Sequence, residues 1–311
     1  MGILVIGMIF VDIKGFPEAA FIPTGRNVGR VERVHGGVGR NVAEDIANIE
    51  LRPRFVSMVD DTPEGEEVLR KLKNHKVNTD YVPAVPNGMG MWLAVFDETG
   101  DIVGSISKRP DMSALETLIN EKGDEIFADC DSIVVELDLD KEIIKSVFKY
   151  AEKYKKRVYA VVANMSIASQ RRDFLQSIDC FVCNVEEAGI LFVSDFEGMS
   201  PEELCDELSR KVVSARIPSM VVTLGSRGAV YADMNGDKGV YPARRVKVRD
   251  TTGAGDAFCA GVLYAAETDM PLREALKLGA CSAAASLSEV SASDGVKTKD
   301  EVLKLYELYG K

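Results

Sequence analysis

The stretch Asp250-Thr-Thr-Gly-Ala-Gly-Asp256-Ala-Phe-Cys-Ala-Gly-Val262 carries more information than any other part of this sequence. Gly253, Ala254 and Gly255 stand directly before a run of small and apolar residues that predicts a helix. The free N–H groups in the first turn of a helix attract anions, and the helix dipole adds to this attraction. A carboxylate beside such a site, here Asp256, can accept a proton from a hydroxyl that attacks a phosphoryl group. The alternative interpretation of Asp256 is a simple helix cap.

Upstream and downstream of this stretch, short apolar strands alternate with amphipathic helices. The pattern predicts strands over residues 3–6, 55–59, 132–135, 158–162, 180–183 and 220–224. It predicts helices over residues 40–49, 63–73, 141–155, 201–214, 255–267, 272–287 and 299–308. This alternation favours an α/β fold with a mostly parallel sheet between helices, and residues 229–233 and 239–248 suggest an antiparallel edge. We expect one such domain over residues 1–311.

Residues 89–107 break the alternation. Two apolar runs, 89–96 and 102–107, flank Asp97-Glu-Thr-Gly-Asp101, which is a β-hairpin pattern. The first run is apolar on both of its faces, which are Met89, Met91, Leu93 and Val95 on one and Trp92, Ala94 and Phe96 on the other. We therefore expect a small β lid, mainly 89–107 with parts of 10–34, that covers a pocket and joins a homodimer through its second face. A central strand of the main sheet is the alternative.

Composition excludes several classes of protein. The chain has 311 residues with 46% hydrophobic and 28% charged residues, which is typical of a globular protein. A net charge of −11 disfavours nucleic acid as a partner, and no apolar run approaches the length of a membrane span. The first residues lack the basic region of a signal peptide, which predicts a cytoplasmic location. The phosphate-binding patterns GxxxxGK[ST] and, after the first strand, GxGxxG are absent.

Four motifs in order resemble those of the PfkB, or ribokinase-like, family of ATP-dependent sugar and nucleoside kinases. Residues 250–262 match the C-terminal signature of that family, and Gly36-Gly-Val-Gly-Arg-Asn-Val-Ala43 matches its N-terminal signature. Between them, Asn184-Val-Glu-Glu187 resembles the N-x-x-E motif, and Thr223-Leu-Gly-Ser-Arg-Gly228 resembles the T-x-G-x-x-G nucleotide loop. The resemblance implies a ribokinase-like fold and transfer of the ATP γ-phosphoryl group to a primary hydroxyl, with Asp256 as the base and Gly253 to Asp256 as an anion hole.

The resemblance also implies roles for residues on the nucleotide side. Glu187 would order Mg²⁺ through water, although an acid favoured by a helix dipole is the alternative. Asp250, together with residues 286–295, resembles the monovalent-cation site of some family members, which would bind K⁺. The expected nucleotide-binding residues are Asn184, Thr223, Gly225 and Gly228.

The acceptor side is predicted from different residues. Gly36 and Gly37 before a helix allow close packing against a ligand, and Asn41 offers both a donor and an acceptor to sugar hydroxyls. Asp12 comes shortly after the first strand, where open α/β sheets bind ligands, although it could be a turn residue. The family places Asp12 and Asn41 on the acceptor hydroxyls. Asn164 follows the strand near residue 162 and should face the same crevice.

The identity of the acceptor is less clear from the sequence. Arg40 directly before Asn41, and Asp111-Met112 after the lid, resemble the pseudouridine-kinase branch, so pseudouridine is the first expectation and Arg40 a candidate substrate contact. Ser107-Lys-Arg-Pro110 and Ala163-Asn-Met165 depart from that branch, which leaves free sugars open. A regulator that kept the fold and lost catalysis is a further alternative, disfavoured because Asp256 is intact.

Overall fold

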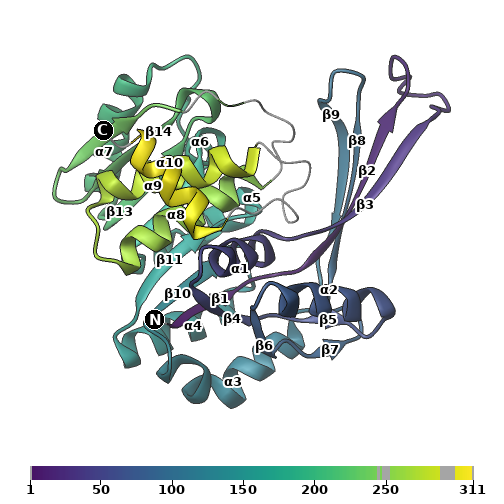
Figure 1. The fold of residues 1–311 in the computed structure, drawn as a ribbon, viewed down its shortest axis with the longest axis horizontal. Coiled ribbons are helices and arrows are strands. Elements are labelled where there is room, and N and C mark those ends of the chain that lie inside the picture. The colour runs from purple at the N-terminus through teal and green to yellow at the C-terminus, as the bar shows by residue number, and fades with distance from the viewer. Residues whose placement is uncertain (1, 244–245, 247–252, 288–297, 310–311) are drawn as a thin grey trace.

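The fold is built on one large sheet with a smaller sheet standing beside it (Figure 1). The computed structural model describes residues 2–243, 246, 253–287 and 298–309. The large sheet has nine strands in the order β15-β14-β13-β12-β11-β10-β1-β4-β6. Its strands are β1 (Gly2–Ile6), β4 (Arg52–Val56), β6 (Asn78–Tyr81), β10 (Ser132–Glu136), β11 (Arg157–Val161), β12 (Cys180–Asn184), β13 (Ser219–Thr223), β14 (Ala229–Asp233) and β15 (Lys238–Tyr241).

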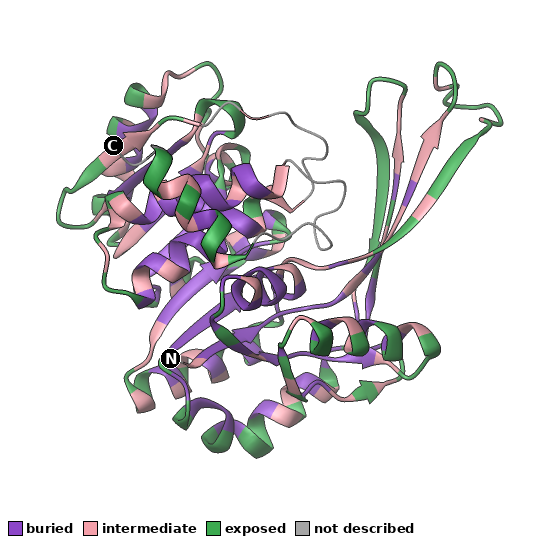
Figure 2. Cartoon of the chain, viewed as in Figure 1, coloured by how far each residue is buried: buried purple, intermediate pink, exposed green. Residues whose placement is uncertain are grey.

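Strands β6 to β13 of this sheet run parallel, whereas β14 and β15 are antiparallel. This confirms the predicted sheet and its antiparallel edge. Strand β15 ends at Tyr241, and residues 244–245 and 247–248 of the predicted run 239–248 lie outside the described residues. The central strands are buried on both faces (Figure 2), which is why they read as continuous apolar runs.

Helices cover the two faces of the sheet and form one hydrophobic core on each. One core includes residues of α3 (Ser113–Ala128), α4 (Lys141–Tyr154), α5 (Met165–Ala168), α6 (Val185–Phe192) and α7 (Pro201–Ala215). The other includes residues of α1 (Val38–Asn48), α2 (Pro63–Asn74), α8 (Ala254–Glu267), α9 (Leu272–Leu287) and α10 (Lys299–Tyr309). The predicted helices are therefore confirmed, and α3, with its weaker apolar periodicity, was missed.

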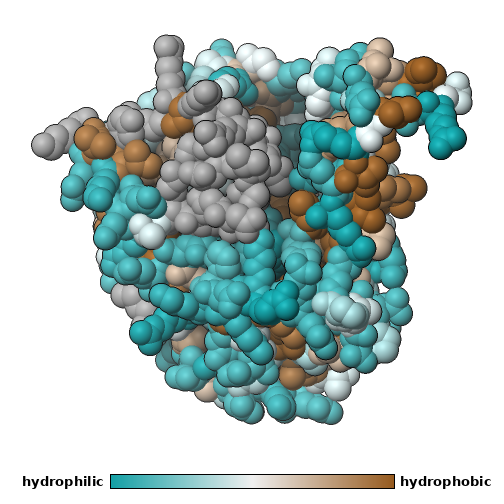
Figure 3. Space-filling model, turned by 45° about the vertical axis from the view of Figure 1, so that its right-hand side comes forward, coloured by the Kyte–Doolittle hydropathy of each residue, from teal (hydrophilic) through white to brown (hydrophobic). Residues whose placement is uncertain are grey.

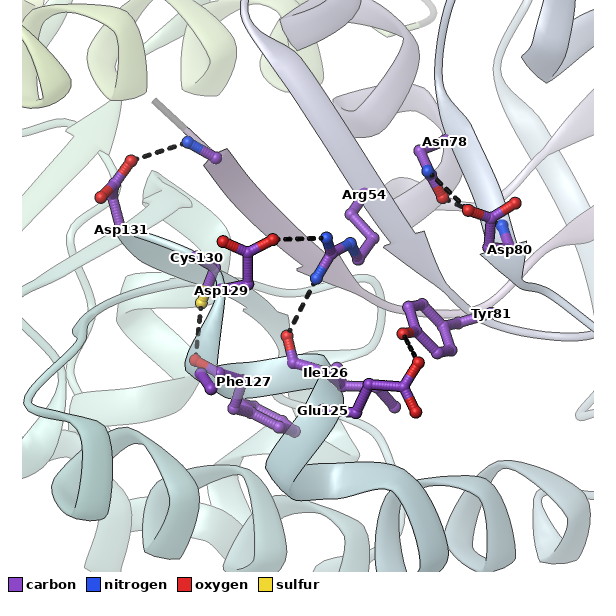
Figure 4. Close-up of polar contacts among 12 residues, drawn as sticks. Arg54, Asn78, Asp80, Tyr81, Glu125, Ile126, Phe127, Asp129, Cys130 and Asp131 are labelled. Atoms are coloured by element: carbon purple, nitrogen blue, oxygen red, sulfur yellow. Dashed lines mark hydrogen bonds and ion pairs between the residues drawn. The ribbon is translucent and has the colours of Figure 1, made fainter.

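Polar contacts tie strands β4 and β6 to the last turns of α3 (Figure 4). The Arg54 guanidinium donates to Asp129 Oδ2 at 3.2 Å and to the carbonyl of Ile126 at 3.4 Å. The Tyr81 hydroxyl donates to Glu125 Oε1 at 2.6 Å. These contacts fix α3 against the β4–β6 side of the sheet, whereas the sequence motifs lie at or beyond the carboxyl ends of the strands.

The smaller sheet has four strands in the order β3-β2-β8-β9. They are β2 (Phe10–Pro17), β3 (Gly29–Gly36), β8 (Gly90–Phe96) and β9 (Ile102–Lys108). Strands β8 and β9 form the predicted hairpin, and the alternative of a central strand in the main sheet is wrong. Strand β2 leaves β1 after only three residues, so this arm-like sheet projects from the carboxyl edge of the large sheet (Figure 1). A two-stranded sheet of β5 (Val59–Asp60) and β7 (Ala84–Val85) lies near its base.

Among the residues that the structure describes, no helix combines the length and the apolar character needed to cross a membrane.

Candidate active site

The first turn of helix α8 has backbone N–H groups that find no partner inside the helix. Gly253 precedes the helix with φ +77°, a left-handed conformation that turns the chain into the helix, and no side chain caps this end. The first hydrogen bond of the helix joins the Ala257 N–H to the Gly253 carbonyl at 2.9 Å. A Cβ built on Gly255 would meet no described atom within 4 Å, so the described residues leave room beside the first turn of the helix. This geometry fits the predicted anion hole.

Asn41 brings the N-terminal motif to the C-terminal motif. Its side-chain Nδ2 donates to Asp256 Oδ2 at 2.7 Å, although the two residues are 215 positions apart in the sequence. Asn41 lies one turn into α1, and α1 packs along α8. The predicted base and the predicted acceptor-binding amide therefore lie in contact.

Arg40 lies behind this contact and has no exposed surface. Its Nη1 donates to the Asn41 Oδ1 at 3.1 Å and to the His35 carbonyl at 2.5 Å, and its Nη2 forms an ion pair with Glu44. The ion pair and the two hydrogen bonds orient the Asn41 amide so that its nitrogen points at Asp256. The predicted substrate contact at Arg40 thus lies outside the crevice, and the geometry fits a positioning residue.

Asp12 lies on the arm-like sheet, within the residues 10–34 that the sequence analysis assigned in part to the lid, and the alternative of a turn residue is wrong. It is a residue of β2, because that strand begins at Phe10. A Cβ on Gly36 would lie 2.3 Å from the Asp12 Oδ2, so the bare glycine is what allows the carboxyl group to sit there. Gly37 follows with φ +100°, a conformation that side chains rarely adopt, and leads the chain into α1. The two glycines thus place Asp12 next to the start of the helix that carries Asn41.

The carboxyl group of Asp256 has an altered proton affinity. Burial raises its pKa to about 7, against the lowering effects of the Asn41 hydrogen bond and the Arg40 charge. The negative charges of Glu187 and Asp12 raise the pKa of Asp256 further. Burial also raises the pKa of Asp12. A carboxylate with a pKa near neutrality is matched to accept a proton from an attacking alcohol.

Asn184 and Glu187 form a reciprocal cap at the start of α6. The Glu187 N–H donates to Asn184 Oδ1 at 2.9 Å, and the Asn184 N–H donates to Glu187 Oε2 at 2.8 Å. Burial raises the pKa of Glu187, and the nearby charges of Glu186 and Asp138 add to the effect. The N-x-x-E motif therefore has a structural role that the sequence alone could not separate from ligand binding.

The predicted nucleotide loop follows β13. The Thr223 hydroxyl donates to the Cys183 carbonyl at 3.5 Å, which ties the end of β13 to the end of β12. Gly225 and Gly228 both have positive φ, +58° and +102°. At Gly228 a Cβ would lie 2.0 Å from the Tyr241 carbonyl oxygen, so the turn needs a glycine there. Thr223 and Asn184 are register partners, and both lie at the carboxyl ends of their strands.

One predicted site residue is not brought to this group, and another lies outside the described residues. Asn164 lies beyond β11, is exposed, and caps α5 by accepting from the Ser166 N–H at 3.1 Å. Asp250, with most of residues 286–295, lies outside the described residues, so the monovalent-cation site stays a prediction.

Two buried carboxylates were missed by the sequence analysis. Glu136, at the end of β10, accepts from the Met8 N–H at 2.7 Å, and Asp138 accepts from the Ala163 N–H at 3.1 Å. Burial raises the pKa of both groups, and that of Glu136 lies well above its ordinary value. They fasten the loops at the carboxyl ends of β1 and β11. The available signal was two acids at the end of a predicted buried strand, which is where such sheets build their sites.

Comparisons with known proteins agree with this geometry. The model of the pfkB family of carbohydrate kinases matches residues 2–299. Guanosine-inosine kinase of Exiguobacterium acetylicum is 37% identical over 282 residues, which are 89% of this chain and 91% of that protein. Pseudouridine kinase of Escherichia coli is 24% identical over 285 residues, or 91% of this chain and 90% of that protein. Arabidopsis thaliana ribokinase, solved with ribose and ATP, matches 97% of both chains at a TM-score of 0.82 and 22% identity.

The fold and the site define a phosphotransferase of ribokinase-like architecture. The chain belongs to the pfkB family of carbohydrate kinases, and it is an ATP-dependent kinase of a small sugar or nucleoside.

Proposed function

We propose that this protein transfers the γ-phosphoryl group of ATP to the primary hydroxyl of a purine ribonucleoside such as guanosine or inosine. The observation that carries the catalytic proposal is the contact of Asn41 with Asp256 beside the free N–H groups of α8. The choice of acceptor rests on the 37% identity to a guanosine-inosine kinase over most of both chains. An ATP-dependent reaction also favours the predicted cytoplasmic location.

In the proposed reaction, the acceptor oxygen attacks the γ-phosphorus while the bond from that phosphorus to the bridging oxygen of ADP breaks. The hydroxyl proton passes to the Asp256 carboxylate. The N–H groups of residues 254–256 stabilise the negative charge on the transferring group. Asp12 and the second proton of the Asn41 amide hold the other hydroxyls of the acceptor. Asn184, Thr223, Gly225 and Gly228 line the nucleotide side.

A divalent cation fits this site through water and through the phosphates of ATP. Among the described residues, no group of three metal-ligating side chains lies together. Glu187 is the candidate residue, with one carboxylate oxygen held by the Asn184 N–H. Mg²⁺ would supply neutralisation of phosphate charge.

Pseudouridine is the second candidate acceptor, because a pseudouridine kinase is 24% identical over most of the chain. Arg40 and Asp111, the two residues that suggested pseudouridine, make structural contacts within this chain. Arg40 is fully buried, and the Asp111 carboxylate accepts from the Ser113 N–H at 3.0 Å at the start of α3. We therefore place purine nucleosides first and pseudouridine second.

An ADP-release assay with ATP and Mg²⁺ tests the acceptor class. We expect turnover with inosine and guanosine to exceed that with pseudouridine and ribose by at least ~10-fold in kcat/KM, a difference of about 1.4 kcal/mol. Preference for pseudouridine would promote the second candidate. Turnover of ribose alone would indicate a free-sugar kinase. ATP binding without turnover of any acceptor would favour a non-catalytic regulator.

The pH dependence of this reaction follows from the pKa of Asp256. Because that pKa is raised to about 7 and the base must be ionised, kcat/KM is expected to rise with pH through a midpoint near 7. An unperturbed aspartate would place this midpoint near 4. The measurement is the initial rate at saturating ATP between about pH 5.5 and 8, a range that brackets the pKa of about 7. A flat profile of kcat/KM over this range would contradict the assignment of Asp256 as the base.

We also propose that the four-stranded sheet is a lid of the single domain and that its outer face joins two subunits. Met91, Leu93 and Ile106 lie on one face by register, and they are 37%, 41% and 71% exposed. Figure 3 shows hydrophobic side chains gathered on this part of the molecule. A self-complementary apolar face suits a twofold pair.

Sedimentation tests the proposed pairing of subunits directly, because it reports the oligomeric state of the chain. We expect the unmodified chain to sediment as a dimer and Leu93→Asp with Ile106→Asp to sediment as a monomer, because the two faces would bury like charges. A monomeric unmodified chain at the concentration of the assay would refute the proposed pairing.

A further inference from the structure

The arm-like sheet carries a tryptophan that has no partner among the described residues. Trp92, the single tryptophan of the chain, is the register partner of Asp12 across β8 and β2. Side chains at paired positions of neighbouring strands point to the same face, about 4.8 Å apart. The Asp12 carboxylate lies against Gly36, just before the helix whose Asn41 contacts Asp256. By register, the indole of Trp92 therefore lies on the same face of the sheet as Asp12, toward the Asn41–Asp256 contact.

The surroundings of Trp92 do not account for a large aromatic residue. It is only partly buried, and among the described residues it belongs to neither hydrophobic core. In the described part of the chain, its ring stacks on no other ring and its N–H has no hydrogen-bond acceptor. By contrast, Phe16 and Phe96 further out on the same face stack on each other with centroids 4.6 Å apart, and Arg30 lies over Phe16. Phe16 and Phe96 therefore pack against each other, whereas the ring of Trp92 has no described ring to pack against.

We propose that Trp92 is the stacking platform for the nucleobase of the acceptor, an inference that rests on the proposed nucleoside kinase function. In a ribonucleoside, the 2′ and 3′ hydroxyls lie between the carbon that bears the base and the carbon that bears the 5′ hydroxymethyl group. Hydroxyls held by Asp12 therefore leave the 5′ hydroxyl free to point at Asp256 and the base free to point along the sheet. The side chain next to Asp12 on the neighbouring strand is Trp92.

This placement assigns specificity to the lid. A base stacked on an aromatic ring gains free energy that a free pentose cannot gain, and the larger ring system of a purine overlaps the indole more than a pyrimidine does. Trp92 thus selects nucleosides over ribose, and purine nucleosides over smaller ones. Val34, which pairs with Asp12 on the other side, offers only a small apolar surface.

The single tryptophan gives a binding readout that needs no turnover. We expect the tryptophan emission of the unmodified chain to change saturably with inosine or guanosine in the absence of ATP, and to change far less with ribose. Trp92→Leu should raise the KM for the nucleoside about 10-fold or more, while the KM for ATP stays within about twofold. Trp92→Phe should restore most of the loss, because it keeps an aromatic face.

Val28→Ala is the matched control, since Val28 is 72% exposed beyond the far end of β3 and no role is assigned to it. Its KM values should equal those of the unmodified chain. Nucleoside turnover with unchanged KM in Trp92→Leu and unchanged emission in the unmodified chain would overturn the platform while leaving the proposed function intact. Turnover of ribose alone would overturn both. If Trp92→Leu melts early, the emission titration of the unmodified chain decides.

Discussion

Asp256→Asn is expected to lower kcat by about 10²- to 10⁴-fold, the contribution of a positioned general base. The substitution removes the proton acceptor but keeps the size and the oxygen that accepts from the Asn41 amide. The backbone donors of residues 254–256 are unchanged, so the affinity for ATP, measured by calorimetry, should stay within about threefold. Catalysis that survives this change at more than a tenth of its rate would show that another group takes the proton.

The same variant has an expected effect on stability that separates catalysis from folding. Burial raises the pKa of Asp256 in the folded chain to about 7. A raised pKa contributes stability below the unfolded pKa near 4, and this contribution is lost as the pH rises through 7. At pH 8 the buried, ionised carboxylate of Asp256 therefore lowers the free energy of unfolding, and the substitution by Asn removes this destabilisation. Asp256→Asn should melt at an equal or higher temperature than the unmodified chain at pH 8, so lost turnover cannot come from unfolding.

Asp12→Ala is expected to raise the KM for the acceptor about 10- to 100-fold, because hydrogen bonds to a charged group contribute about 1.5–3 kcal/mol. The KM for ATP should change little, since Asp12 lies on the arm-like sheet and the predicted nucleotide residues follow β12 and β13. Gly36→Ala should reproduce the acceptor effect in part, because its Cβ would displace the Asp12 carboxylate. The readout is initial rate against acceptor concentration at saturating ATP.

Glu18→Ala is the matched control for Asp12→Ala. Glu18 is an exposed acid one residue beyond the far end of β2, so its removal changes the charge of the arm equally without touching the crevice. Equal KM changes in the two variants would mean that the net charge of the arm, and not the position of Asp12, attracts the acceptor.

The catalytic motif and the main fold were predictable from the sequence for a local reason. The small residues before α8 and the buried runs of β1, β10, β12 and β13 leave patterns within a few consecutive residues. The hairpin of β8 and β9 was predictable in the same way, from two apolar runs around a turn. The resemblance of four ordered motifs then implied the kinase class, which the family match confirms.

Contacts between distant residues were not predictable, because no local pattern encodes them. Nothing in the neighbourhood of Asn41 indicates that its amide meets Asp256, or that Arg40 is buried behind it with Glu44. The sequence left a turn open as the alternative for Asp12, because the three-residue connection between β1 and β2 leaves no pattern that marks where β2 begins.

The sequence by itself determined the class of fold, the anion-binding start of α8 and the residue types available for chemistry, since these depend on local periodicity and small residues. Only the tertiary structure decided which side chains meet. Strand register placed Trp92 beside Asp12, and the packing of α1 against α8 placed Asn41 on Asp256. The physical reason is that burial and long-range packing set the geometry and raise the pKa of the base, and both depend on the whole chain.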